Sequence, residues 1–171
     1  MDVLPADDTL DAAGTALGLA LPPSYRAFVK RYGFGLSAGM FIVYVPAPPG
    51  HVGRSQNLVD MSRVLAREVR EALANKWVRF QPGVTEEIVR RLVPFAYSEN
   101  AHRLAWDPGE RTGDGELTIY AIGRGYNPIH RAGPHLLAFF ERALEPGVGG
   151  LFGRSNNDLE PTFDPWKMFV E

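Results

Sequence analysis

The sequence contains no cysteine, little net charge and no long apolar run. Among its 171 residues, 18 are Lys or Arg and 20 are Asp or Glu, which gives a formal net charge of −2. Without cysteine the chain has no disulfides, no thiolate nucleophile and no cysteine-ligated zinc. A small net charge gives no electrostatic reason for the whole chain to bind nucleic acid or a membrane surface. No stretch approaches the ~20 apolar residues of a membrane-spanning helix, and the acidic N-terminus lacks a signal-peptide pattern, so we expect a cytoplasmic protein.

The charges that are present are unevenly distributed. The first eleven residues carry four aspartates and no basic residue. Between Ser62 and Leu92, seven basic residues stand against four acidic ones. The seven are Arg63, Arg67, Arg70, Lys76, Arg79, Arg90 and Arg91. We interpret this stretch as a solvated helix face, with a binding patch as the alternative.

Hydrophobic periodicity predicts helices first, then strands, then a closing helix. Helices are expected over residues 8–17, 23–32, 57–74, 85–92 and 134–144, with Asp8, Asn57 and Thr85 as caps. Strands are expected over residues 40–45, 94–98, 102–107 and 116–123, with a turn over 108–115. This order indicates an α+β fold, a single domain whose mainly antiparallel sheet is flanked by helices. We expect its core to span about residues 8–145 and residues 146–171 to form a glycine-rich loop and a docked tail.

Residues 35–39 read "GLSAG" and match the G-x-S-x-G pattern of a serine-hydrolase nucleophile elbow. In an elbow the serine lies on a sharp turn between a strand and a following helix, which exposes its Oγ. Here the expected order is reversed, because the helix precedes Ser37 and the strand follows it. We therefore predict a structural role for the glycines and keep a hydrolase that uses Ser37 as an alternative.

The other candidate motifs are weaker. The stretch "GVGGLFGRS" (147–155) has glycines like those of a phosphate-binding loop, but its basic residue is Arg154 and it follows a helix. The four histidines lack the spacing of a metal site, and no pair of carboxylates stands out as an acid and base. The histidines are His51, His102, His130 and His135. We therefore expect no catalytic residues, no cofactor and no metal.

The stretch "LGLALPPSYRAFVKRYGFG" resembles the opening of the SUKH superfamily, the Smi/Knr-like domains. The family signature is a leucine-proline pair followed by an aromatic helix that ends in tyrosine or asparagine and glycine. The matching residues are Leu21, Pro22, Tyr25, Phe28, Tyr32 and Gly33. The segments "LVPFAYSENAHRLAWDP", "GELTIYAIG" and "PHLLAFFERAL" are similar to the later strands and the last helix, so the resemblance spans roughly residues 10–144. "SENAHR" stands where many members have a glycine and an acidic residue.

The resemblance implies a binding protein without catalytic residues. Bacterial members are mostly immunity proteins that neutralise a cognate toxin, often a nuclease or deaminase, by covering it. We therefore expect a toxin-like protein partner and neither a membrane nor direct nucleic-acid contact. The expected contact residues, chosen because turns and strand ends project polar and aromatic groups, are Glu99, Asn100, His102, Asp107 and Tyr126. A regulatory or scaffold module is one alternative, and a nucleic-acid binder that uses the arginine-rich helix is another.

Overall fold

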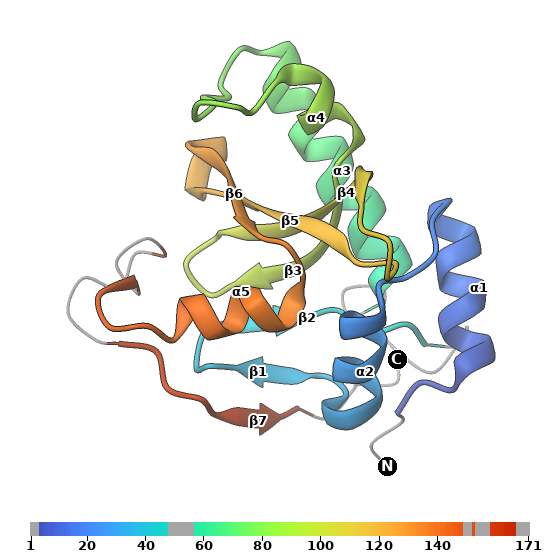
Figure 1. Cartoon of the computed structure of the whole chain (residues 1–171). Coiled ribbons are helices and arrows are strands. Elements are labelled where there is room, and N and C mark those ends of the chain that lie inside the picture. Colours follow the sequence, from blue (N-terminus) through green and yellow to red (C-terminus); the bar gives the residue numbers. More distant parts are fainter. Residues whose placement is uncertain (1–3, 48–56, 149–151, 153–157, 167–171) are drawn as a thin grey trace.

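One antiparallel sheet of seven strands organises the described part of the chain (Figure 1). The computed structural model describes residues 4–47, 57–148, 152 and 158–166. The strands are β1 (Gly35–Ser37), β2 (Phe41–Val43), β3 (Val93–Ser98), β4 (Arg103–Arg111), β5 (Leu117–Ile122), β6 (Ile129–Gly133) and β7 (Phe163–Pro165). Their order is β6-β5-β4-β3-β2-β1-β7, and each neighbouring pair is antiparallel.

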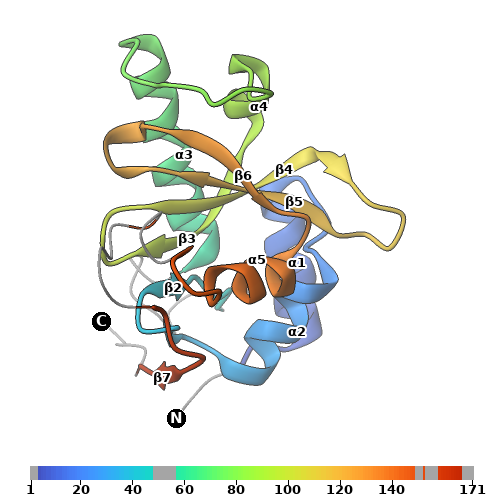
Figure 2. The same cartoon turned by 60° about the vertical axis from the view of Figure 1, so that its left-hand side comes forward.

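Helices cover both faces of this sheet, which confirms the predicted α+β class (Figure 2). They are α1 (Asp7–Leu17), α2 (Pro23–Tyr32), α3 (Leu58–Ala74), α4 (Glu86–Arg91) and α5 (Leu136–Ala143), with a short 3-10 helix, η2 (Arg124–Tyr126). In Figures 1 and 2, α2 and α5 lie on one face, α3 and α4 lie on the other, and α1 packs beside α3. None of the helices in the described residues is long and apolar enough to cross a membrane.

Two of the three predicted helix caps are confirmed. The side chain of Asn57 accepts a hydrogen bond of 2.9 Å from the Val59 amide, and Thr85 caps α4 in the same way. The prediction for Asp8 is wrong, because α1 begins one residue earlier and Ala6 occupies the cap position without a side-chain bond. Asp8 lies instead in the first turn, where a negative charge is favourable beside the helix dipole.

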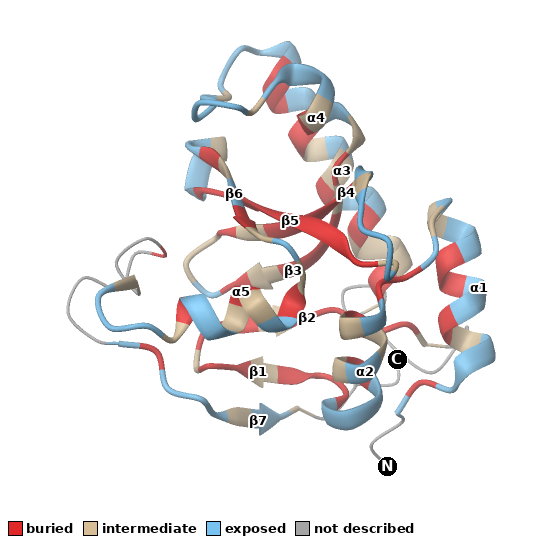
Figure 3. Ribbon diagram, viewed as in Figure 1, coloured by how far each residue is buried: buried red, intermediate tan, exposed pale blue. Residues whose placement is uncertain are grey.

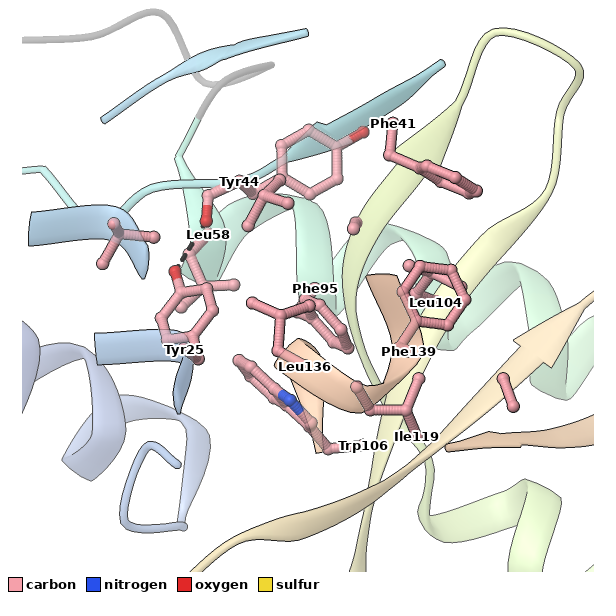
Figure 4. Packing of buried hydrophobic residues seen from close by; sticks show 14 of the residues in the cluster. Tyr25, Phe41, Tyr44, Leu58, Phe95, Leu104, Trp106, Ile119, Leu136 and Phe139 are labelled. Atoms are coloured by element: carbon pink, nitrogen blue, oxygen red, sulfur yellow. Dashed lines mark hydrogen bonds between the residues drawn. The ribbon is translucent and has the colours of Figure 1, made fainter. Parts of the chain in front are cut away.

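Burial on both faces explains the alternation in β5. Leu117, Ile119 and Ala121 belong to the larger core cluster, whereas Tyr120 and Ile122 pack with residues of α3 and α4 in a smaller one. Figure 3 shows β5 in the colour of buried residues. The centre of the larger cluster is aromatic. These rings and their neighbours are drawn in Figure 4. All six residues of β5 are buried, so the strand lies in the middle of the protein.

The rings of Phe95 and Trp106 stack with centroids 4.2 Å apart, and Tyr25 contacts Trp106 edge-on at 4.8 Å (Figure 4). The Tyr25 hydroxyl donates a 2.6 Å hydrogen bond to the Tyr44 carbonyl oxygen, so a fully buried polar group has a partner. Burial raises the pKa of Tyr25 well above its usual value, so the hydroxyl remains a proton donor. This group ties α2 to the segment that follows β2.

The sheet is larger than the sequence predicted. The predicted turn over 108–115 is confirmed only over 112–115, because β4 continues to Arg111 through an irregularity in its pairing with β5. Strands β1, β6 and β7 were not predicted, and the predicted strand 40–45 is limited to β2. β7 pairs with β1, and the Trp166 amide donates a 3.0 Å bond to the Phe34 carbonyl oxygen. The last helix begins at Leu136 rather than Pro134, because His135 is its cap.

Candidate functional site

Four of the five predicted contact residues come together at one end of the sheet. Glu99, Asn100 and His102 lie in or beside the turn between β3 and β4, and Tyr126 lies between β5 and β6. These two connections are adjacent because the first residue of β4 pairs with Ile122, the last residue of β5. Glu99 is exposed, whereas the Asn100 side chain is half-buried and donates a 2.9 Å bond to the Phe152 carbonyl oxygen.

His102 is buried beneath this turn. Its backbone amide donates a 3.0 Å bond to the Ser98 hydroxyl, and its ring meets Phe152 edge-on at 5.8 Å. Burial lowers the pKa of His102 below its ordinary value of 6.5, and the nearby His130 lowers it further. The neutral ring therefore acts as a packing group in the structure as described.

Asp107 lies further along β4 and its side chain is fully buried. Arg91 of α4 donates two bonds to its carboxylate, from Nε at 2.6 Å and from Nη2 at 2.9 Å, and the Gly109 amide donates a third at 2.8 Å. A side chain on Gly109 would collide with the guanidinium of Arg91, so glycine makes room for this pair. The carboxylate of Asp107 thus joins α4 to the sheet and presents no surface to a partner.

Tyr126 is half-buried and belongs to a mixed aromatic and ionic cluster. The guanidinium of Arg103 lies 4.9 Å from the centroid of the Tyr126 ring and 5.8 Å from that of Tyr97. The same guanidinium donates a 2.7 Å bond to Glu68 of α3. Cation–π contacts and the ion pair together anchor η2 against α3. Burial raises the pKa of Tyr126, so its hydroxyl stays protonated near neutral pH.

The connection between α3 and α4 carries Trp77, the most exposed aromatic side chain in the described residues, and the exposed Phe80. Trp77 is 62% exposed and Phe80 is 41% exposed. Lys76 and Arg79 lie in the same segment and are also exposed. We call Lys76, Trp77, Arg79, Phe80 and the exposed Arg124 of η2 the Trp77 surface.

Backbone hydrogen bonds hold the Trp77 surface to the edge of the sheet. The Arg79 amide donates to the Tyr126 carbonyl oxygen at 3.4 Å, which places the connection beside η2 and its Arg124. The Ile129 amide donates to the Arg79 carbonyl oxygen at 3.0 Å, and the Gln81 amide donates to the Ile129 carbonyl oxygen at 3.1 Å. Phe80 and Ile129 form a parallel bridge. The aromatic residues are therefore exposed on a backbone that the fold fixes in place.

The cations of the Trp77 surface are unpaired within the described residues. None of Lys76, Arg79 and Arg124 forms an ion pair with another described residue. Exposed Arg67 and Arg70 of α3 extend the positive charge along the helix, with Glu71 as the exposed anion between them and the connection. The five predicted contact residues did not include this surface. The sequence signal for this surface was a tryptophan and a phenylalanine that lie in one stretch of four residues, within the basic segment.

Ser37 does not have the setting of a nucleophile elbow. It is the last residue of β1 and leads through a tight turn into β2, so strand follows strand. Its Oγ is buried and makes no hydrogen bond with any described residue. A serine nucleophile needs an accessible Oγ and a base within hydrogen-bond reach, and the described residues supply neither. In the turn, Ala38 and Gly39 both adopt positive φ angles, of 53° and 59°, so Gly39 has the backbone role predicted for the glycines.

The remaining motifs give no further site in the described part of the chain. The described residues contain no group of three or more His, Asp or Glu side chains that could hold a metal ion. His51, Arg154 and most of the glycine-rich stretch lie outside the described residues. His130 lies on β6, and its Nδ1 is buried without a hydrogen-bond partner among the described residues. Comparisons with known protein families, with curated proteins and with solved structures found no match.

Proposed function

We propose that this chain is a non-enzymatic protein-binding domain that holds its partner on the Trp77 surface. In keeping with the SUKH resemblance, the role we propose is that of a cytoplasmic immunity protein that neutralises a toxin by covering it. The observation that carries the proposal is a tryptophan that is 62% exposed on a connection fixed by three backbone hydrogen bonds. The proposal no longer counts Asp107 and His102 among the contact residues, because both side chains are buried.

The composition of the Trp77 surface favours a protein partner. Tryptophan and arginine are the residues most enriched among binding hot spots, where they fill pockets on the partner. The backbone of this connection is already ordered, so binding requires less conformational entropy to be lost. Trp77 and Phe80 supply the apolar anchors, and Lys76, Arg79 and Arg124 supply a charged rim.

The charges predict the sign of the partner's contact surface. Unpaired cations around an aromatic anchor favour a patch of Asp and Glu side chains around an apolar pocket. A phosphate backbone would meet the cations but offers no apolar pocket for Trp77 and Phe80. We therefore expect the partner to present an acidic patch. The chain would then cover the toxin from beside its active site and would not act as a nucleic-acid mimic.

The experiment starts with a photo-crosslinking amino acid in place of Phe80 in the host cell, where the crosslinked protein is identified by mass spectrometry. That protein is then purified and its affinity is measured for the wild type and for Trp77→Ala. We expect the variant to bind about 30-fold to 1,000-fold more weakly, as for a hot-spot residue worth about 2–4 kcal/mol. Leu137→Ala is the matched control, since Leu137 is 59% exposed on α5 and should not change the affinity.

A growth assay separates immunity from a scaffold role. If the partner is a toxin, its expression should stop growth, the wild-type chain should restore it, and Trp77→Ala should not. A partner that is harmless to the cell would contradict immunity and support the regulatory alternative. Equal affinity of the wild type and Trp77→Ala for the partner would remove the Trp77 surface from the proposal. RNA binding that weakens as salt rises and that Trp77→Ala abolishes would replace it with the nucleic-acid alternative.

A further inference from the structure

A pocket of about 310 Å³ opens between α2, α5 and the segment that leads into β7. None of the residues that line it carries a charge. Its walls are aromatic. The rings of Phe28 and Phe140 stack with centroids 5.6 Å apart and planes 16° apart, and Tyr32 and Phe163 lie 5.1 Å apart. Four rings from three separate segments therefore meet around one cavity.

The rim of this pocket is open to solvent, and its floor is ordered. Tyr32 is 46% exposed and Leu137 is 59% exposed at the rim. At the floor, the Ala38 amide donates a 2.8 Å hydrogen bond to the Thr162 carbonyl oxygen, which ties the turn after β1 to the segment that leads into β7. The pocket is thus formed by paired backbone rather than by one movable side chain.

Ser37 lines the floor of the pocket. It pairs directly with Phe163 in the sheet, so the two side chains project from the same face. Ser37 is only 4% exposed, and its Oγ makes no hydrogen bond with any described residue. Buried hydroxyl groups normally have a partner, so this hydroxyl marks the place where a ligand would supply one. The Oγ is covered by its neighbours, so a ligand that bonds to it at the pocket floor must first displace them.

We propose that this pocket binds an uncharged aromatic molecule that carries one hydroxyl group, with the Ser37 hydroxyl as its hydrogen-bond partner. The aromatic walls fit a flat ring, and the uncharged lining leaves an ionised group without a counter-charge. A cavity of about 150 Å³ holds benzene, so a pocket twice that size fits a molecule of two fused rings. Such concave, mostly apolar sites with one or two polar groups are typical of small-molecule binding.

The test measures binding of 2-naphthol, naphthalene and 2-naphthoate to the full chain by NMR titration. We expect 2-naphthol to bind about 2-fold to 12-fold more tightly than naphthalene, which is the difference made by one hydrogen bond. Ser37→Ala should remove this preference while it leaves naphthalene binding intact. The anion 2-naphthoate should bind at least ten times more weakly than 2-naphthol, because no cation lines the pocket.

Two controls keep the proposal separate from the protein-binding one. Trp77→Ala lies outside the pocket and should leave all three affinities unchanged, whatever it does to a protein partner. A 2-naphthol preference that survives Ser37→Ala, or equal binding of 2-naphthoate, would overturn the proposal. So would the absence of binding up to the solubility limit of each compound. If Leu137→Arg abolishes binding of the protein partner, the pocket is part of that interface and the ligand proposal is likewise wrong.

Discussion

The two faces of the sheet are stabilised by different interactions. Under α2 and α5 the contacts are between rings, as in the stacked pair of Phe95 and Trp106. Under α3 and α4 a smaller, mainly aliphatic cluster is joined by ion pairs, as in the pairs of Arg91 with Asp107 and of Glu68 with Arg103. The same division reaches the surface, because the aromatic side ends in an uncharged pocket and the charged side ends in the Trp77 surface. Each face thus presents to a partner the kinds of side chain that also pack beneath it.

Removal of the central ring should have the largest effect on the fold. Trp106→Ala deletes a side chain that is 1% exposed and that contacts both Phe95 and Tyr25, so we expect a loss of about 3–5 kcal/mol in the free energy of unfolding. The measurement is urea unfolding followed by circular dichroism. Trp77→Ala is the matched control, and we expect it to change the unfolding free energy by less than about 0.5 kcal/mol. Equal losses in the two variants would contradict the exposure of Trp77.

The charged face should lose less when its buried pair is broken. Asp107→Ala leaves Arg91 without its carboxylate, but the Arg91 side chain is 36% exposed and can turn to solvent. We therefore expect a loss of about 2–3 kcal/mol, at the lower limit for a broken buried ion pair. Glu86→Ala breaks a solvent-exposed pair with Arg90 on the same helix and should cost at most about 0.5 kcal/mol. If both substitutions had the same small effect, burial of the Asp107 pair would not contribute to stability.

Local patterns in the sequence predicted the structural features that neighbouring residues determine. The alternation in β5 and the caps Asn57 and Thr85 depend on side chains within a few positions, so their assignments are confirmed. The pairing of β1 with β7 joins segments more than 120 residues apart, and no local signal reports it. For the same reason the sequence indicated the turn around Glu99 but not the burial of Asp107 by Arg91.

Exposure is the property that the sequence conveyed least. Trp77 and Trp106 are the same residue type, yet one is 62% exposed and the other 1% exposed. Trp77 follows a helix whose buried stripe has already ended, whereas Trp106 lies on a strand with a covered face on either side. The candidate site therefore became visible only with the tertiary structure. The SUKH resemblance and the immunity role stay predictions.

Near neutral pH the aromatic face, rather than the charged one, should carry the pH dependence of stability. Burial lowers the pKa of both His102 and His130 in the folded chain below the ordinary value of 6.5. Below about pH 6.5 the unfolded chain therefore binds more protons than the folded one, and the free energy of unfolding falls as the pH decreases. Unfolding titrations between pH 7.5 and pH 5 should show this decline, and His102→Gln with His130→Gln should flatten it. An unchanged decline in the double variant would assign the dependence to other groups.

The smallest effect on stability should come from substitution of Ser37, the serine of the G-x-S-x-G pattern. Ser37 and Ser62 are both buried, on different sides of the core. Their hydroxyls differ in whether they form a hydrogen bond. Ser62 donates a hydrogen bond to the Pro94 carbonyl oxygen, so Ser62→Ala should cost about 1–2 kcal/mol. Ser37→Ala removes a hydroxyl without a partner among the described residues and should leave the free energy of unfolding unchanged or raise it by up to about 1 kcal/mol. A loss equal to that of Ser62→Ala would mean that the Ser37 hydroxyl is already satisfied, and the pocket floor would then have no free group to offer a ligand.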